Sequence, residues 1–220
     1  YVKFPTISDQ ARLTRLEPPK GKVRVVIDTD TFNEVDDQFA LVHALLSPDK
    51  LGLEAIYAAP FFNKHSTSPE DGMEKSYEEI LTLFGRMNHS AAGLVYKGSR
   101  RYFNADNLEH SDAVEDLIER ALASKDEPLY VVAIAAISNI ATAIMLEPKI
   151  IEDIVVVWLG GHSLTWPHTK EFNLVQDVAG ANLLFDSGVP LVLVPCMGVT
   201  SHLTTTVAEL EKFVAPCGAI

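Results

Sequence analysis

Four aspartates in one short stretch of the chain have the residue type and the spacing to bind a cation. Asp28 and Asp30 directly follow Val23–Ile27, a mostly apolar run that predicts a buried strand. Asp36 and Asp37 come a few residues later, where a helix is expected to begin. Negative charges gathered in this way repel one another unless protons, hydrogen bonds or a cation compensate them. Ligands that are all oxygen suit calcium or magnesium better than zinc or copper.

The simplest alternative is that the aspartates only cap a helix. Apolar periodicity over Phe39–Leu46 predicts a helix after Asp36 and Asp37. An aspartate at the start of a helix is ordinary and contributes about 1 kcal/mol. Capping accounts for the second pair of aspartates but leaves the first pair unexplained, so the spacing favours a metal site.

Strands and helices are predicted to alternate along the chain. The predicted strands are Val23–Ile27, Leu53–Ala59, Leu129–Ala136, Asp153–Leu159 and Leu191–Val194. The predicted helices after Phe39–Leu46 are Asp71–Phe84, Asp112–Ser124, Ser138–Leu146, Asp177–Phe185 and Val207–Val214. This alternation predicts an α/β fold, with a doubly wound, mostly parallel sheet and helices on both faces. Ligands bind such sheets at the carboxyl ends of the strands, where Asp28 and Asp30 stand.

The length and composition indicate one domain. The chain has 220 residues, of which 47% are hydrophobic, and this suffices for a sizeable core. We therefore expect residues 1–220 to form a single α/β domain. Residues 1–21 contain Pro5, Pro18 and Pro19, and they predict an irregular leader that wraps the domain.

The charge and the apolar runs exclude several classes of partner. A net charge of -12 and a pI of about 4.9 predict repulsion of phosphate backbones, so we expect no nucleic acid partner. The longest apolar runs, Leu129–Ile137 and Ile154–Leu159, are too short to span a bilayer, and we expect no membrane partner. Cys196 and Cys217 form no CxxC pattern and suggest a reducing compartment. With charges and no apolar signal segment among the first residues, a cytoplasmic protein is expected.

Five segments in order resemble motifs of the inosine-uridine-preferring nucleoside hydrolases. That family has a strand followed by DTDPG, one residue and DD. The counterpart here is Asp28-Thr29-Asp30-Thr31-Phe32-Asn33-Glu34-Val35-Asp36-Asp37. The later segments are Ala135–Asn139, Leu159–Gly161, Glu171–Asn173 and Val194–Thr200, which resemble the family's GPLTN, MGG, EFN and PLDVT. No single motif is diagnostic, but their common order makes the resemblance specific.

The resemblance implies a reaction and a set of residues that perform it. The reaction is calcium-dependent hydrolysis of the N-glycosidic bond of a ribonucleoside, which gives ribose and free nucleobase for purine and pyrimidine salvage. By this resemblance Asp30 is both a calcium ligand and the base that activates water. Asp37 is a second calcium ligand and the Ser138 backbone carbonyl a third. The residues implied in binding ribose hydroxyls are Asp36, Glu171 and Asn173.

Other candidates for substrate contact lie in two loops. His162 and His168 stand in Gly161–Thr169, beside the predicted site, as contacts or proton donors for the base. Asn63 stands near the position where the family places an asparagine after the second strand. For each of these residues, and for Glu171 and Asn173, the alternative is a solvated loop residue. Ser138 has the alternative of capping the helix that follows it.

The chain departs from the family pattern in three places. Two extra residues separate Asp30 from Asp36, and the Pro-Gly pair is missing. Trp166, Pro167 and His168 occupy the loop in which the family has an asparagine before EFN. The family pattern also continues past the end of this sequence with a His-Asp pair that completes the calcium shell and protonates the base. We therefore expect a fragment of a longer protein, or a truncated member with weak or no activity.

Two alternative functions stay open at this stage. A ribose- or nucleoside-binding homologue would keep the pocket without turnover. A phosphohydrolase like the haloacid dehalogenases would use Asp28 as nucleophile and Asp30 as acid with magnesium. That pattern wants threonine or valine in place of Phe32, and it leaves Asp36 and Asp37 unexplained. The nucleobase preference and a possible homo-oligomer also stay open.

Overall fold

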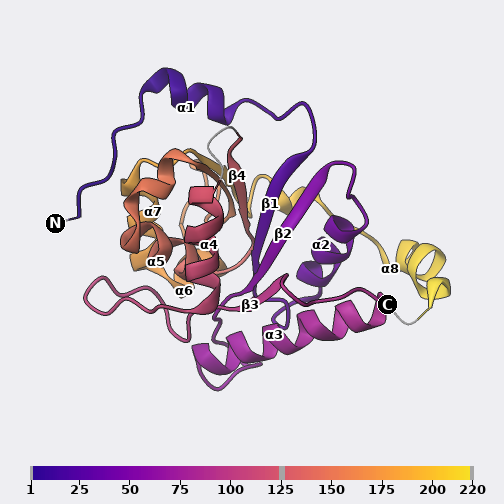
Figure 1. Cartoon of the computed structure of the whole chain (residues 1–220). Coiled ribbons are helices and arrows are strands. Elements are labelled where there is room, and N and C mark those ends of the chain that lie inside the picture. The colour runs from indigo at the N-terminus through magenta and orange to yellow at the C-terminus, as the bar shows by residue number, and fades with distance from the viewer. Residues whose placement is uncertain (1, 124–126, 219–220) are drawn as a thin grey trace.

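A single sheet forms the centre of the molecule. The computed structural model describes residues 2–123 and 127–218, and Figure 1 shows helices on either side of the sheet. The strands follow the order β3-β2-β1-β4-β5-β6, and each pair of neighbours is parallel. They are β1 (Val23–Thr29), β2 (Leu51–Ala58), β3 (Val95–Lys97), β4 (Leu129–Ala133), β5 (Ile154–Leu159) and β6 (Leu191–Val194). The prediction of a doubly wound α/β fold with a mostly parallel sheet is confirmed.

Helices cover both faces of the sheet and bury the two sides of each central strand. The main helices are α2 (Val35–Leu45), α3 (Pro69–Arg86), α4 (Asp112–Ala123), α5 (Ser138–Leu146) and α7 (Val178–Ser187). On β1, Val25 and Ile27 belong to the core shared with α2 and α3. Val26 belongs to the core shared with α4, α5 and α7. Burial on both faces explains why the strands are continuous apolar runs instead of alternating patterns.

The order of the strands reverses at β1, and this reversal positions the site. The chain first builds outward from β1 to β2 and β3, then crosses over to β4 on the other side of β1. The carboxyl ends of β1 and β4 therefore lie next to each other, with Asp28 paired in register with Ala133. Crossover connections leave such an edge in opposite directions, which opens a crevice for a ligand.

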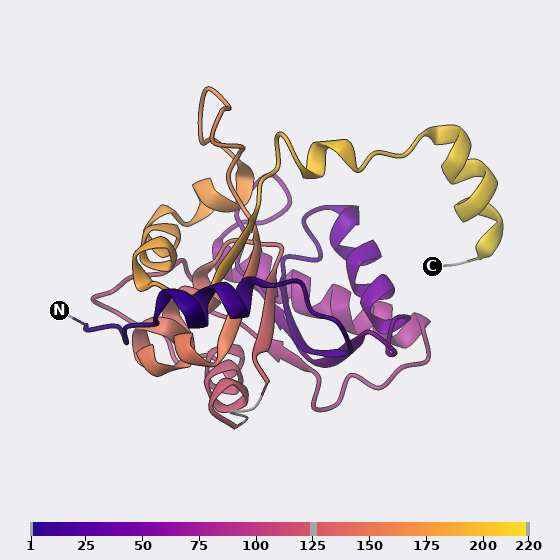
Figure 2. The ribbon, with the colours of Figure 1, turned by 90° about the horizontal axis from the view of Figure 1, so that it is seen from above.

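The leader differs from the expected irregular segment because it contains a helix, α1 (Asp9–Leu16). The Ser8 hydroxyl caps it by accepting from the Ala11 N–H at 3.2 Å. No residue of α1 is buried. Arg12 donates to the Gly188 carbonyl at 2.5 Å, and Figure 2 shows α1 lying across the body of the molecule. This hydrogen bond ties α1 to Gly188, the C-cap of α7.

Near the site, the chain turns earlier than the apolar pattern predicts. β4 ends at Ala133 instead of Ala136, although the Ile134 N–H still donates to the Asp28 carbonyl at 2.9 Å. The Ala135 carbonyl accepts from the Trp158 ring N–H at 3.1 Å, which holds the turn into α5. A short helix not expected from the sequence, α6 (Phe172–Gln176), precedes α7.

The segment after β6 leaves the sheet, as Figure 2 shows. It contains the short helical turns η2 (Thr200–His202), α8 (Val207–Glu209), η3 (Leu210–Val214) and η4 (Ala215–Cys217). Another short turn, η1 (Pro148–Glu152), lies earlier in the chain and precedes β5. Ser124, the expected end of α4, lies outside the described residues. Within the described ranges, no helix combines the length and apolar character needed to cross a bilayer.

Candidate active site

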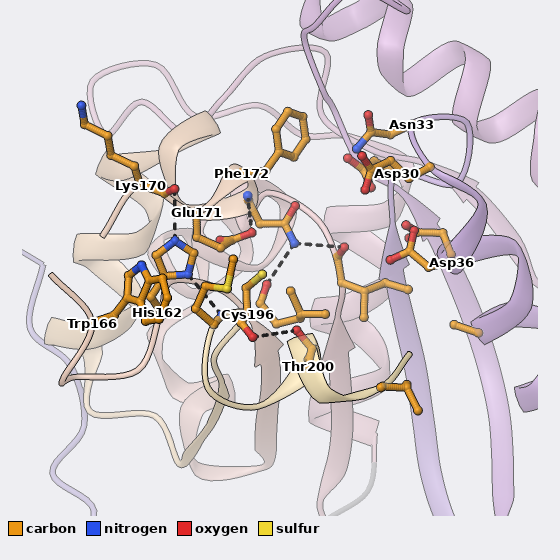
Figure 3. Close-up of a pocket in the computed structure, with 18 of the residues that line it drawn as sticks. Asp30, Asn33, Asp36, His162, Trp166, Lys170, Glu171, Phe172, Cys196 and Thr200 are labelled. Carbon is orange, nitrogen blue, oxygen red and sulfur yellow. Dashed lines mark hydrogen bonds between the residues drawn. The ribbon is translucent and has the colours of Figure 1, made fainter. Parts of the chain in front are cut away.

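A cavity of about 630 Å³ lies at the carboxyl ends of the central strands (Figure 3). Asp30 follows β1, Ile134 follows β4 and Leu159 ends β5, and all three line it. One wall comes from the β1–α2 connection and a second from the chain between β5 and α6. The third comes from the segment after β6, and its lining residues are Cys196, Met197, Thr200 and Leu203.

Three of the four predicted aspartates are buried at this edge. Asp28 is 0%, Asp30 1% and Asp37 5% exposed, and the last two line the cavity. Burial raises the pKa of both Asp28 and Asp37 to about 7, and neighbouring carboxylates add to the rise. Burial also raises the pKa of Asp30 well above its usual value, with further contributions from Asp37, Asp28 and Asp36. The negative charges therefore destabilise one another, and a bound cation would relieve them.

The hydrogen bonds at the aspartates leave two buried oxygens without a partner. The Thr29 hydroxyl donates to Asp37, and the Asn139 amide donates to Asp28 Oδ2 at 2.7 Å. Asp28 Oδ1 and Asp30 Oδ2 are buried and accept no hydrogen bond from the described residues. No described lysine or arginine forms an ion pair with these carboxylates either. An unpartnered buried carboxylate oxygen is costly, and Asp30 Oδ2 fits the role of a ligand for a hard cation.

The donors at this position suit calcium only in part. Asp30 and Asp37 supply two carboxylate groups that line the same cavity and could bind calcium. In the part of the chain that the structure describes, no three His, Cys, Asp or Glu side chains are grouped so that they could hold a metal ion. Any further ligand would therefore be a backbone oxygen, a water or the substrate itself.

Ser138, the predicted source of that backbone oxygen, is fully buried at the first residue of α5. Its hydroxyl donates to Asp177 Oδ2 at 2.5 Å. The atom that the resemblance assigns as a calcium ligand is the backbone carbonyl oxygen, not this hydroxyl. Ser138 is not among the residues that line the cavity, and its role as a ligand stays a prediction.

Two further polar candidates lie around the rim near α2. Asp36 is exposed in the first turn of α2 and lines the cavity together with Asn33. Asn63 does not line it, but its amide donates to Asn33 Oδ1 at 2.6 Å. Asn63 therefore contacts Asn33, which lines the cavity, without lining it itself.

Glu171 and Asn173 are buried and belong to the cavity wall instead of a solvated loop. Glu171 caps α6: its carboxylate accepts from the N–H groups of Gly161 (2.8 Å), Asn173 (2.9 Å) and Leu174 (3.0 Å). The Asn173 amide donates to the carbonyls of Ile134 (3.2 Å) and Leu159 (3.0 Å), so it joins the ends of β4 and β5. Asn173 Oδ1 bonds to no described residue, so it can accept a hydrogen bond from a ligand.

The two predicted histidines line the cavity but differ in their hydrogen bonds. His162 Nε2 lies 3.2 Å from the Lys170 carbonyl, while Nδ1 accepts from the Met197 N–H at 3.3 Å. His168 Nδ1 accepts from the Lys170 N–H at 3.3 Å, and its Nε2 bonds to no described residue. His162 is therefore occupied on both nitrogens, whereas His168 retains one for a ligand.

The family model of the inosine-uridine preferring nucleoside hydrolases matches residues 25–218. The chain belongs to this family. The match covers the aspartates, the cavity and the segment after β6, and it confirms the resemblance drawn from the motifs. Membership also argues against the haloacid dehalogenase alternative, which accounts only for Asp28 and Asp30.

Two relatives of this chain are named as pyrimidine-specific ribonucleoside hydrolases. A pyrimidine-specific ribonucleoside hydrolase, RihA, from Enterobacter sp. (strain 638) is 26% identical over 210 residues, which cover 86% of this chain and 64% of that protein. RihA from Klebsiella pneumoniae (strain 342) is also 26% identical, and the chain covers 65% of it. The chain thus spans slightly less than two thirds of the length of these relatives.

Solved structures of other nucleoside hydrolases share the fold. The purine-preferring ribonucleoside hydrolase from Gardnerella vaginalis is 25% identical, with a TM-score of 0.60 over 78% of this chain and 60% of that one. A plant nucleoside hydrolase, PpNRh1, is 23% identical, with a TM-score of 0.65 over 88% and 65%. At such identity the second likeness supports the fold alone.

Sequence reasoning assigned no role to Asn139, although it stands in the AAISN motif. Asn139 is fully buried, and its amide group joins three strand ends: besides Asp28 it contacts the Ala58 carbonyl at 3.3 Å and the Ser99 N–H at 2.7 Å. At Gly98, a Cβ would lie 2.0 Å from the Ala58 carbonyl oxygen, so only glycine lets the backbones approach this closely. The available signal was an amide side chain in the mostly apolar helix α5.

Proposed function

We propose that this chain contributes the ribose-binding and water-activating part of a nucleoside hydrolase. The reaction is cleavage of the N-glycosidic bond of a small-molecule ribonucleoside, which yields ribose and free nucleobase. The observation that carries the proposal is Asp30, whose buried carboxylate lines the cavity with one oxygen unpartnered. The family relationship and the cluster of carboxylates around Asp30 support it.

Cleavage of the N-glycosidic bond needs negative charge at the side of the cavity that carries Asp30 and Asp37. Cleavage of an N-glycoside builds positive charge on the sugar, which carboxylates beside the ring stabilise. The Asp30 carboxylate lines the cavity, and one of its oxygens would take a proton from the attacking water, as a general base does. Asp30, Asp37 and the Ser138 carbonyl would hold calcium, which supplies positive charge that acidifies and orients water and binds sugar hydroxyls.

The ribose hydroxyls have several acceptors within the same cavity. Asp36 is exposed on the rim, and Asn173 Oδ1 is free of bonds to the described residues. Glu171 already accepts three backbone N–H groups, so only part of its acceptor capacity is left for a hydroxyl. We expect Asp36 and Asn173 to contribute more to ribose binding than Glu171, whose main effect is to hold the cavity wall.

A second function, nucleoside binding without turnover, is favoured by one observation. A leaving nucleobase needs a proton, and both nitrogens of His162 are engaged by backbone groups. In the described part of the cavity, only His168 keeps a free ring nitrogen among the histidines. Binding would then persist while hydrolysis is slow.

The test is release of free base from inosine and uridine, with calcium and with a chelator. We expect turnover to require calcium and to fall by about 10²–10⁴-fold in Asp30→Asn, because a general base is lost. Asp49→Asn, at an exposed position remote from the cavity lining, serves as a matched control. Turnover that survives chelation, or that Asp30→Asn leaves intact, would contradict the assignment. Calorimetric nucleoside binding without base release would identify the binding function instead.

We further propose a cytoplasmic role in purine and pyrimidine salvage. Both cysteines are free, Cys196 at the cavity and Cys217 at the surface, which suits a reducing compartment. Labelled ribonucleosides supplied to cells that depend on salvage would show whether their bases are recovered through this protein.

A further inference from the structure

The connection between β1 and α2 brings one amide side chain, that of Asn33, to a side of the cavity that otherwise carries carboxylates (Figure 3). The carboxylates that line this side are Asp30, Glu34, Asp36 and Asp37. Among the described side chains that residues 30–40 contribute to the lining, Asn33 alone has an N–H group to donate. It stands in the stretch where this chain has two residues more than the family pattern.

A turn and a second amide hold Asn33 in place. Its backbone N–H donates to the Asp30 carbonyl at 2.7 Å, so the turn starts at the carboxylate residue itself. The Asn63 amide donates to Asn33 Oδ1 at 2.6 Å. Asn63 Oδ1 accepts from the His65 N–H at 2.8 Å. Because a backbone N–H can only donate, this contact fixes which end of the Asn63 amide is oxygen, and Asn63 in turn fixes the orientation of the Asn33 amide.

The Asn33 side-chain nitrogen is left to donate to a ligand. Its oxygen is engaged by Asn63, and Nδ2 bonds to no described residue. A sugar hydroxyl has one hydrogen to donate and lone pairs that accept. Carboxylates satisfy the hydrogen but cannot donate to the lone pairs. Asn33 supplies the donor that the neighbouring carboxylates lack, so this side of the cavity is complementary to both functions of a hydroxyl group.

We propose that Asn33 is a further substrate-binding residue, which donates a hydrogen bond to a sugar hydroxyl, and that Asn63 is the positioning residue that aims it. The inference rests on the proposed function, which places the sugar beside Asp30. Asn63 does not line the cavity, so its effect on the ligand passes through Asn33. The extra residues between Asp30 and Asp36 thus supply a hydroxyl contact of this chain's own.

The test measures dissociation constants of pseudouridine by calorimetry in the presence of calcium. This nucleoside joins base and sugar by a carbon–carbon bond, so the proposed reaction does not consume it. We expect Asn33→Ala to weaken binding by about three- to tenfold, the size of one net hydrogen bond. Asn33→Asp keeps the shape of the side chain and an oxygen for Asn63 but exchanges the donor for an acceptor. It should weaken binding at least as much as Asn33→Ala.

A double-mutant cycle tests the positioning role of Asn63. Asn63→Ala should weaken pseudouridine binding in the wild-type background and have little further effect in the Asn33→Ala background, because both substitutions remove the same contact. Analogues that each lack one sugar hydroxyl identify the partner. Removal of the hydroxyl that Asn33 contacts should cost the wild type more affinity than it costs Asn33→Ala.

Two controls separate substrate binding from damage to the fold. Asn182→Ala, at an exposed position of α7 outside the cavity lining, should leave the dissociation constant unchanged. The urea midpoint of Asn33→Ala should equal that of the wild type. A lowered midpoint that accounts for the loss of binding would assign Asn33 a structural role and overturn the inference.

The remaining outcomes distinguish this inference from the proposed function. Base release from uridine, with a pseudouridine affinity that Asn33→Ala leaves unchanged, would overturn the inference alone. Binding that depends on Asn33 and Asn63, without base release from inosine or uridine, would uphold the inference and overturn the hydrolase proposal. Additive effects of the two substitutions, equal sensitivity of wild type and Asn33→Ala to every hydroxyl, or no binding of pseudouridine would overturn the inference.

Discussion

In the absence of calcium, the stability of this protein should fall as the pH rises from about 4 to 7. The cause is the buried carboxylates of Asp28 and Asp37, whose pKa rises from 3.8 to about 7. Between these values the unfolded chain has released protons that the folded chain still binds, so the free energy of unfolding decreases with pH. The stability that these groups contribute is thus complete below pH 3.8 and is lost as the pH rises through 7.

The size of the effect follows from the same two values. A rise of the pKa from 3.8 to about 7 corresponds to about 4 kcal/mol for one independent group. The groups interact, so two such contributions are an upper bound on their joint effect. Since whole domains are stable by only about 5–15 kcal/mol, the chain without calcium should be markedly less stable at pH 7.5 than at pH 5.

The assay is urea denaturation at pH 4.5, 6 and 7.5 in the presence of a chelator. Asp37→Asn cannot ionise, and Thr29 can still donate to its side-chain oxygen. At pH 7.5 this variant should be more stable than the wild type by up to about 4 kcal/mol, and the difference should shrink toward pH 4.5. Asp49→Asn, which removes an exposed carboxylate, controls for net charge.

Calcium should reverse the loss, because a ligand of the folded state alone stabilises it. We expect a larger gain from calcium at pH 7.5 than at pH 5, since protons compete for the carboxylates at the lower pH. A wild-type stability that is flat or rises between pH 4.5 and 7.5 in chelator would refute this reasoning. So would an Asp37→Asn variant that shows no advantage at pH 7.5.

Three further predictions test the surroundings of the site. Asn139→Ala should lower the free energy of unfolding by about 2–5 kcal/mol, because Asp28 Oδ2 and the Ser99 N–H lose their partner in the core; an unchanged urea midpoint would contradict this. Gly98→Ala should reduce the yield of folded protein, measured by its thermal transition, since its Cβ would overlap the Ala58 carbonyl. A generic phosphate ester with magnesium should not be hydrolysed; Asp28-dependent release of phosphate would revive the dehalogenase alternative.

The strands, and the position of Asp28 and Asp30 at the end of β1, could be predicted because their signals are local. Burial on both faces produces continuous apolar runs, and the residues after such a run stand at the edge where ligands bind. The helices α1 and α6 lacked this kind of signal: α1 buries no residue and α6 has five residues, too few for a periodic stripe. Neither helix was expected from the apolar pattern of the sequence.

The roles of individual polar residues depend on contacts between distant segments. His162 was indistinguishable from His168 in sequence. In the structure the Nδ1 of each histidine accepts from a backbone N–H, and only His162 also has its Nε2 engaged, by the Lys170 carbonyl. Asn63, predicted as a substrate contact, donates to Asn33 Oδ1, and of these two residues it is Asn33 that lines the cavity. Composition and periodicity carry no information on such pairings, whereas motif order identified the family without them.

The two sides of the cavity are built by opposite parts of the chain, and the doubly wound topology brings them together. Asp30 and Asp37 follow β1, the first strand, while Gly161 and Ser163 bond to the segment after β6, the last strand. Between them, Asn173 joins the carbonyl ends of β4 and β5. Because the sheet brings these segments together, the arrangement of the cavity depends on the fold of β1 through β6. A substitution on one side of the cavity can therefore weaken ligand binding by residues on the other side. We expect the effects of Asp36→Asn and His162→Phe on the free energy of nucleoside binding to be non-additive.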